Sequence, residues 1–159
     1  MIKVLFICHG NICRSPMGEF MLKTMVKERG IEKDFHIESA ATSSEELGNP
    51  VYPPARRKLE EHGIACGGKR ARRMQKRDYQ DFDYLIGMDE ENRYNMKRIT
   101  GGDPDGRMFC LMDFTERPRE VADPWYTRNF DATWDDLYEG CEAFLRYLGY
   151  APVNSYSFA

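Results

Sequence analysis

Long hydrophobic runs are missing from this sequence of 159 residues, and none approaches the ~20 apolar residues that a membrane-spanning helix needs. The start, Met1-Ile2-Lys3, precedes only a short apolar stretch without a small-residue cleavage site, so we expect no secretory signal peptide. Basic residues are not in excess either, since 23 lysines and arginines face 26 acidic residues, for a net charge of −3. This balance disfavours general binding to nucleic acid. We therefore expect neither a membrane nor a nucleic acid as partner.

The number and spacing of the cysteines also disfavour a disulfide framework. The five cysteines are odd in number and lack framework spacing, so we expect reduced thiols and a cytoplasmic protein. No internal repeat or low-complexity linker divides the chain. The length and the ordinary apolar and charged content predict one domain over residues 1–159 with a single core.

Segments typical of strands alternate with segments typical of helices. A continuous apolar run over residues 2–8 predicts a strand that is buried on both faces. Further strands are expected at 35–39, 82–88 and 107–112. Helices are expected after Pro16, over 53–63, from residue 89 and over 134–148, with Gly30, Gly63 and Gly149 as stops. This alternation predicts an α/β fold with right-handed crossovers and a parallel sheet, which binds ligands at the carboxyl ends of its strands.

The start of the chain brings a thiol, a loop, a guanidinium and a helix N-terminus together. The first strand ends at Cys8, Arg14 follows six residues later, and Ser15 leads into the helix. A phosphate monoester is a dianion, which loop N–H groups, a helix N-terminus and the planar fork of Arg14 would neutralise. Gly10 lets the backbone approach a ligand closely, and Asn11 tolerates a left-handed turn. We therefore expect a phosphate-binding loop here.

The same loop favours the thiolate form of Cys8, which is the nucleophilic form of cysteine. We expect Ser15 to donate its hydroxyl to this sulfur. The spacing alone is not specific, because Cys66 and Arg72 are also six residues apart. Cys66, however, follows an expected helix end and precedes a basic surface segment, so the context favours Cys8. The competing interpretation of Cys8 is a small buried hydrophobic residue at a strand end.

Expelling an alcohol or a phenol needs a proton donor. Asp123 follows the fourth predicted strand, and Pro124 restricts it to an extended or turn conformation. The aromatic pair Trp125 and Tyr126 comes directly afterwards. Asp89, at the end of the third predicted strand, is the second candidate for the acid, although a role at the start of a helix explains it better.

Residues 8–16, Cys8-His9-Gly10-Asn11-Ile12-Cys13-Arg14-Ser15-Pro16, closely resemble the signature loop of the low-molecular-weight protein tyrosine phosphatases. Residues 38–43 with 48–50, residues 82–92 and residues 123–126 resemble the same family in the same order. The resemblance covers nearly the whole chain. It implies a three-layer fold, in which helices flank both faces of a four-stranded parallel sheet, and an enzyme without a metal or an organic cofactor.

The resemblance further implies hydrolysis of phosphotyrosine in proteins, or of small aryl phosphates, through a phosphocysteine at Cys8. Arg14 would clamp the phosphoryl group, Asp123 would act as acid and then as base, and Trp125 and Tyr126 would form a substrate wall. The loop residues expected to bind phosphate are His9, Gly10, Asn11, Ile12, Cys13, Arg14 and Ser15. Inorganic phosphate and vanadate would inhibit the enzyme.

A support network and a redox partner are implied as well. Asn11, Ser15 and Ser39 would form hydrogen bonds that shape the loop and steady the thiolate. Cys13 would form a reversible disulfide with Cys8 under peroxide, which protects the nucleophile from over-oxidation.

Three positions depart from the family pattern. His9 stands where an apolar residue usually follows the nucleophile. Glu45 and Glu46 occupy a stretch that typically holds an aromatic wall residue, for which Tyr52 is a candidate replacement. These two acids hint at a preference against acidic peptides, or for a compact substrate. Residues 66–69 lack the histidine that supports the loop in many members. The phosphoryl chemistry is therefore better supported than the preference for phosphotyrosine.

Three alternatives stay open. An arsenate reductase on the same scaffold needs a relay of further cysteines, but residues 70–109 contain none. A non-catalytic phosphate-binding module would require neither Cys8 nor Asp123. A weakly active regulatory partner of a tyrosine kinase is the third alternative, for which the sequence has no test.

Overall fold

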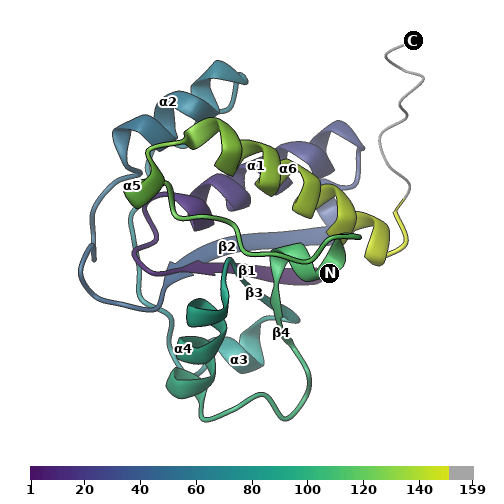
Figure 1. The fold of residues 1–159 in the computed structure, drawn as a ribbon. Coiled ribbons are helices and arrows are strands. Elements are labelled where there is room, and N and C mark those ends of the chain that lie inside the picture. The colour runs from purple at the N-terminus through teal and green to yellow at the C-terminus, as the bar shows by residue number, and fades with distance from the viewer. Residues whose placement is uncertain (151–159) are drawn as a thin grey trace.

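A computed structural model describes residues 1–150 of the chain, so residues 151–159 of the predicted domain lie outside the described part. Four parallel strands form its central sheet, in the order β2-β1-β3-β4 (Figure 1). The strands are β1 (Ile2–Cys8), β2 (Phe35–Ala41), β3 (Tyr84–Gly87) and β4 (Met108–Cys110). The prediction of an α/β fold with a four-stranded parallel sheet is therefore confirmed.

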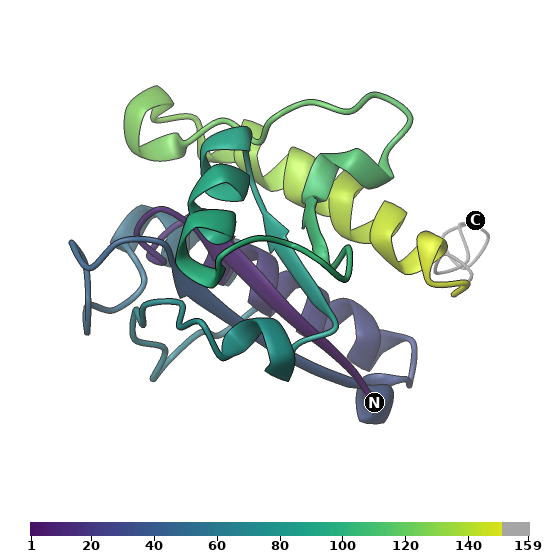
Figure 2. The same ribbon diagram turned by 90° about the horizontal axis from the view of Figure 1, so that it is seen from below.

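Helices cover both faces of the sheet (Figures 1 and 2). On one side lie α1 (Arg14–Glu28), α2 (Pro53–Glu61), α5 (Pro124–Thr127) and α6 (Phe130–Tyr147). On the other side lie α3 (Asp78–Asp81) and α4 (Glu90–Thr100). Two 3-10 helices, η1 (Glu32–Asp34) and η2 (Leu111–Phe114), complete the elements. None of the helices within residues 1–150 combines the length and the apolar character needed to cross a membrane.

The residues of β1 explain why layers form on both faces. Val4 and Phe6 belong to the hydrophobic cluster that contains residues of α1 and α6. Leu5 and Ile7 belong to a second cluster with residues of α3 and α4. Successive side chains of a strand point to opposite faces, and all four have no exposed surface. The apolar run therefore forms a strand buried on both faces, as predicted.

The strand order places a topological switch at the end of β1. The chain passes from β1 to β2 on one side, and later enters β3 on the other side of β1. Ligands of open parallel sheets bind at the carboxyl ends of the strands where the order reverses in this way. Cys8 is the last residue of β1 and pairs in register with Ala41, so the predicted nucleophile stands at the switch point.

Several boundaries differ from the sequence-based expectations, and η1, α3, η2 and α5 were not predicted. β3 is shorter than residues 82–88, because Phe82 closes α3 by donating its amide to the Asp78 carbonyl. β4 ends at Cys110 since η2 follows at once. α1 begins at Arg14, before Pro16, because a first-turn proline lacks only an N–H that would be unpaired there. The predicted glycine stops are confirmed: α1, α2 and α6 each end two residues before Gly30, Gly63 and Gly149.

Candidate active site

Residues 9–13 form a tight loop between β1 and α1, and amides of neighbouring segments bind carbonyl groups in this loop and at the end of β1. These bonds run from Thr42 N to Cys8 O at 3.0 Å, from Ser43 N to His9 O at 3.1 Å and from Tyr52 N to Ile12 O at 2.9 Å. Asn11 has a φ of 59°, which confirms the predicted left-handed turn. The carbonyl groups of His9 and Ile12 are therefore already satisfied, and these bonds fix the loop.

The amides of loop residues 10–13, in contrast, donate to no acceptor in the part of the chain that the structure describes. Asn11, Ile12 and Cys13 are buried, and a buried N–H without a partner is unfavourable. A loop that presents several unpaired amides is suited to bind an anion. The N-terminus of α1 adds its partial positive charge at the same place.

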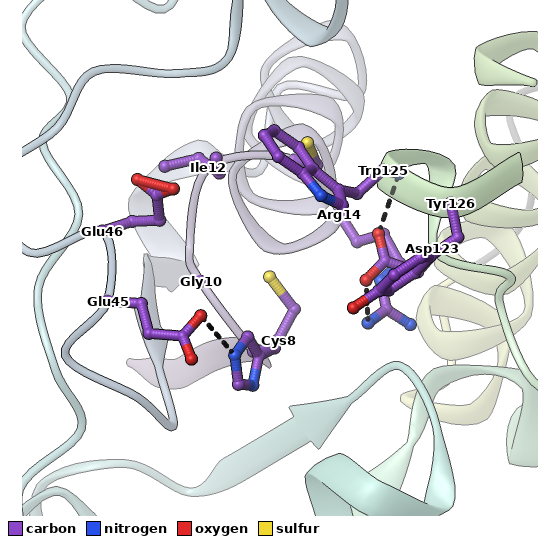
Figure 3. Close-up of a pocket in the computed structure, with 11 residues that line it drawn as sticks. Cys8, Gly10, Ile12, Arg14, Glu45, Glu46, Asp123, Trp125 and Tyr126 are labelled. Carbon is purple, nitrogen blue, oxygen red and sulfur yellow. Dashed lines mark hydrogen bonds and ion pairs between the residues drawn. The ribbon is translucent and has the colours of Figure 1, made fainter. Parts of the chain in front are cut away.

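Cys8 lines a pocket of about 350 Å³ above this loop, as Figure 3 shows. The Cys8 sulfur lies 3.0 Å from Ser15 Oγ and accepts the Ser15 amide at 3.4 Å. The expected contact between Ser15 and the thiol is therefore present. Within residues 1–150 no cluster of three or more His, Cys, Asp or Glu side chains could hold a metal ion.

The predicted support residues meet behind the loop. Asn11 Nδ2 donates to Ser15 Oγ at 2.7 Å and to Ser39 Oγ at 2.9 Å. All three side chains are buried. Asn11 Oδ1 in turn accepts the amide of Arg72 at 3.2 Å. These bonds from the protein interior fix Asn11 in its left-handed conformation.

Arg14 presents one edge of its guanidinium to the pocket and is anchored by the other. Its Nη1 donates to Asp89 Oδ2 and to the carbonyl of Val121, both at 2.8 Å, and its side chain is 3% exposed. Within residues 1–150 all its side-chain hydrogen bonds come from Nη1, so Nε and Nη2 are available for two oxygens of a ligand. Burial opposes the charge, but Cys8, Asp89 and Asp123 outweigh burial and raise the pKa of Arg14 above its ordinary value.

Asp89 has both carboxylate oxygens engaged. Oδ1 accepts the amide of Asn92 at 2.7 Å and caps the N-terminus of α4, while Oδ2 holds Arg14. The role at the start of a helix, which the sequence favoured, is confirmed. The contact with Arg14 adds a positioning role, and an oxygen bound to a guanidinium is poorly suited to be the proton donor.

Asp123 points one carboxylate oxygen at the pocket. Its Oδ1 accepts the amide of Trp125 at 3.0 Å and caps α5, and its Oδ2 lies 3.6 Å from Arg14 Nη2. Val121 fixes this segment, because its amide donates to the carbonyl of Met88 at 3.0 Å while its carbonyl accepts from Arg14. The segment after β4 is thereby tied to the end of β3, and Asp123 reaches the same pocket as Cys8.

The two walls of the pocket differ in chemistry (Figure 3). Trp125 and Tyr126 lie on the side of Arg14 and Asp123, as the predicted substrate wall requires. The opposite wall is formed by His9, Glu45 and Glu46, and His9 Nε2 lies 3.0 Å from Glu45 Oε2. The pocket is therefore aromatic on one side and acidic on the other.

Tyr52 does not replace an aromatic residue on that opposite wall, so this prediction was wrong. Its ring packs against Trp125, with the centroids 4.9 Å apart, and it lies outside the lining of the pocket. The Arg128 guanidinium donates to the Tyr52 hydroxyl at 3.1 Å and lies over the Trp125 ring. Tyr52 therefore supports the aromatic wall from behind.

The other cysteines behave differently from Cys8. Cys13 is buried and lines the same pocket, and burial together with Cys8 and Asp123 raises its pKa well above the ordinary value. Cys66 packs in the core. Arg72, its partner in the repeated spacing, pairs with Asp78 at 3.1 Å and Glu38 at 3.4 Å. The choice of Cys8 over Cys66 agrees with this geometry.

The sequence did not single out Glu19 and Lys69, which complete the support network. Ser39 Oγ donates to Glu19 Oε1 at 2.5 Å, and Lys69 Nζ donates to the Ser39 carbonyl at 2.9 Å. The available signal was that Glu19 lies four residues after Ser15, on the same face of the helix. Lys69 belongs to the segment that lacks the supporting histidine.

Comparison with known proteins identifies the family of this chain. The family described as low molecular weight phosphotyrosine protein phosphatase matches residues 3–153. The low molecular weight protein-tyrosine-phosphatase YfkJ of Bacillus subtilis is 36% identical over 147 residues, which cover 91% of this chain and 94% of that protein. Its crystal structure has a TM-score of 0.89 at 34% identity and covers 94% of this chain and 95% of its own.

Two further solved structures are similar to this chain. SP-PTP, a low molecular weight protein tyrosine phosphatase from Streptococcus pyogenes, has a TM-score of 0.84 at 34% identity, over 99% of this chain and 97% of its own. The drosophila arginine phosphatase DARP has a TM-score of 0.86 at 28% identity, over 94% and 99%. The match over nearly the whole length shows that this chain is an enzyme of the low molecular weight phosphotyrosine protein phosphatase family.

Proposed function

We propose that this chain hydrolyses aryl phosphate monoesters, and phosphotyrosine in proteins above all, through a phosphocysteine at Cys8. The observation that carries this proposal is the position of the Cys8 sulfur. Ser15 contacts it through its hydroxyl and its amide, and the sulfur lines a pocket whose loop amides are unpaired in the described chain. Arg14 and Asp123 line the same pocket. A nucleophile, a phosphate cradle and a proton donor are thus within one cavity.

In the first step the Cys8 thiolate attacks phosphorus. The S–P bond forms while the bond between phosphorus and the phenolic oxygen breaks, and Asp123 gives its proton to that oxygen. Nε and Nη2 of Arg14 and the loop amides bind the non-bridging oxygens, whose charge is redistributed during the transfer.

In the second step water attacks the phosphocysteine. Asp123, now a carboxylate, takes a proton from this water, a P–O bond forms and the S–P bond breaks. Inorganic phosphate leaves, and the thiolate of Cys8 is restored. The Ser15 hydroxyl, 3.0 Å from the sulfur, donates to the departing thiolate. Free phosphate and vanadate would occupy the same cradle and inhibit.

We assign Cys13 as the redox partner of Cys8. Hydrogen peroxide would oxidise the Cys8 thiolate to a sulfenic acid, and the Cys13 sulfur would then displace water and form the disulfide. Cys13 lines the same pocket, and its raised pKa keeps it a thiol, so Cys8 is oxidised first. Peptide mapping after mild peroxide should find the Cys8–Cys13 disulfide in the wild type. Further oxidised, inactive Cys8 should appear in Cys13→Ser.

The acidic wall predicts a preference against acidic flanking residues. Glu45 and Glu46 line the pocket opposite Trp125 and would repel a carboxylate beside the phosphotyrosine. The comparison is between phosphopeptides that differ only in Glu or Lys next to the phosphotyrosine. We expect a preference for Lys of about threefold, the range of exposed ion pairs, which Glu45→Gln with Glu46→Gln removes. A preference for Glu in the wild type would contradict this.

The experiment that tests the function compares turnover of phosphotyrosine, phosphoserine, phosphoarginine and arsenate. We expect vanadate-sensitive release of phosphate from phosphotyrosine peptides and from p-nitrophenyl phosphate, and no reduction of arsenate. Tight phosphate binding without turnover would instead indicate a binding module. Faster hydrolysis of phosphoarginine would transfer the assignment to that substrate.

A further inference from the structure

A continuous chain of hydrogen bonds runs from the Cys8 sulfur into the interior and ends at a buried ion pair. Its successive contacts are Cys8 Sγ to Ser15 Oγ (3.0 Å), Asn11 Nδ2 to Ser15 Oγ (2.7 Å), Asn11 Nδ2 to Ser39 Oγ (2.9 Å), Ser39 Oγ to Glu19 Oε1 (2.5 Å) and Lys69 Nζ to Glu19 Oε1 (3.3 Å). Glu19 is 4% exposed. The far end of this chain is therefore a charged group inside the protein.

The ionised Glu19, which only accepts, and the amide nitrogen of Asn11, which only donates, together set the direction of the bonds in this chain. An ionised carboxylate only accepts, so Ser39 donates its one hydroxyl hydrogen to it. Ser39 Oγ then accepts from Asn11, whose amide nitrogen donates its second hydrogen to Ser15 Oγ. The Ser15 hydroxyl already accepts, and its own hydrogen is left for Cys8. The chain thus ends in an O–H donor to the sulfur, which favours the thiolate over the thiol.

Lys69 contacts two residues at the inner end of this series of hydrogen bonds, Glu19 and Ser39. Its Nζ lies beside the Glu19 carboxylate, and it donates to the main-chain carbonyl of Ser39 at 2.9 Å. Its side chain is 12% exposed. Burial lowers the pKa of Lys69 below its ordinary value, although Glu19 opposes this effect. Lys23 also contacts Glu19, at 2.6 Å, but its side chain is 44% exposed.

We propose that Lys69 is a positioning residue for the nucleophile: it keeps Glu19 ionised as the acceptor of the Ser39 hydroxyl, so that Ser39 Oγ can accept from Asn11, and thereby holds Asn11 and the Ser15 hydroxyl in place against Cys8. This inference rests on the proposed role of Cys8. The charged groups that act on Lys69 are Glu19 and Lys23 of α1 and Arg72 of its own segment. Within residues 1–150 the Lys69 side chain bonds to Ser39 and Glu19 and to no residue that lines the pocket, so it acts through others.

The test measures the reactivity of Cys8 directly, by the rate of its alkylation with iodoacetamide as a function of pH. Mass spectrometry of the peptide that contains Cys8 gives the rate for this cysteine alone. Arg14, Asp123, His9 and Cys13 also face Cys8 and are unchanged in every variant. In Lys69→Met we expect the midpoint of the profile to move up by about one pH unit, the worth of a hydrogen bond to a charged group.

Turnover of p-nitrophenyl phosphate provides a second readout. At neutral pH kcat/KM of Lys69→Met should fall about tenfold, and most of the loss should disappear at a pH above the shifted midpoint. A merely structural defect would not be repaired by raising the pH. Lys69→Arg keeps a charged donor and should lie within about threefold of the wild type. Lys23→Met, the matched control on the same carboxylate, should change the midpoint little.

Glu19→Gln provides a second test of the proposal if Lys69→Met fails to fold. Glutamine has nearly the same shape, but its amide can donate to Ser39, whose hydroxyl hydrogen then turns toward Asn11 Nδ2 and weakens the bond that anchors Asn11. The midpoint for Cys8 should rise in this variant as well. A folded Lys69→Met or Glu19→Gln protein with the wild-type midpoint overturns the proposal. A shifted midpoint in a protein that hydrolyses no phosphate ester would leave this proposal standing and refute the proposed function instead.

Discussion

Arg14 Nη1 lies 2.8 Å from Asp89 Oδ2, although the two residues are 75 positions apart in the chain. Arg14 is the first residue of α1 and Asp89 is the N-cap of α4, so the pair joins helices from opposite faces of the sheet. A cation at a helix N-terminus opposes the helix dipole, and the carboxylate of Asp89 offsets this. The pair therefore fixes the guanidinium, and within residues 1–150 Nε and Nη2 donate no hydrogen bond.

Asp89→Asn tests the importance of this contact for phosphate binding. Asparagine caps a helix as well as aspartate does, so α4 should be preserved and the melting temperature should change little. The loss of the carboxylate beside a buried guanidinium should lower kcat/KM by about tenfold and weaken phosphate inhibition by a similar factor. Steady-state kinetics with inorganic phosphate as inhibitor measure both effects. An unchanged inhibition constant would show that Arg14 is held by Val121 alone.

Cys8→Ser should abolish turnover and keep the binding of phosphate, because a serine hydroxyl is a far weaker nucleophile and the cradle is intact. Binding can be followed by calorimetric titration with phosphate. Cys66→Ser is the matched control, since Cys66 packs in the core away from the pocket, and it should retain most of the activity. Loss of activity in Cys66→Ser without loss of folding would mean that the nucleophile is misassigned.

Asp123→Asn should affect poor leaving groups most. The asparagine oxygen can still accept the Trp125 amide that Asp123 Oδ1 accepts, so α5 keeps its cap, but the proton donor is gone. We expect a loss of about 100-fold with phenyl phosphate, and a much smaller one with p-nitrophenyl phosphate, whose leaving group needs little protonation. The measurement is kcat across a series of substituted phenyl phosphates. An equal loss for all members would exclude Asp123 as the acid.

Two buried thiols should make the folded protein less stable at alkaline pH. Burial raises the pKa of Cys110 to about 12, and it raises the pKa of Cys141 further, from an ordinary value of 9.0. The folded protein therefore retains protons that the unfolded chain loses above about pH 9. This contribution to stability is complete below that pH and is lost as the pH rises through the folded-state pKa.

Cys141→Ala removes one of these groups, and Cys141 has no exposed surface. Above about pH 9 the free energy of unfolding should decline less steeply in this variant, by about 1.4 kcal/mol per pH unit. Urea unfolding at a series of alkaline pH values measures the slope. The comparison concerns slopes, because the lost packing of the sulfur shifts the whole curve. Identical slopes would show that Cys141 does not titrate with unfolding.

The sequence determined the elements whose signals are local. The apolar run of β1 and the residues that follow it, from Cys8 to Ser15, are neighbours in the chain, so their order already predicts a strand, a loop and a helix around an anion. The left-handed turn at Asn11 was predictable for the same reason. The acid candidate Asp123 could be named because a proline and an aromatic pair follow it.

Only the tertiary structure decided which distant residues complete the site. Arg14 meets Asp89 and Val121 across 75 and 107 positions, and Ser39 meets Lys69 across 30. The sequence suggested Tyr52 for the wall that Glu45 and Glu46 form, whereas Tyr52 packs against Trp125, and it did not single out Glu19. Such contacts depend on the order of the strands and on the packing of helices on both faces. Local patterns record which way a side chain points along its own element, but the partner it meets is set by the elements that the fold brings beside it.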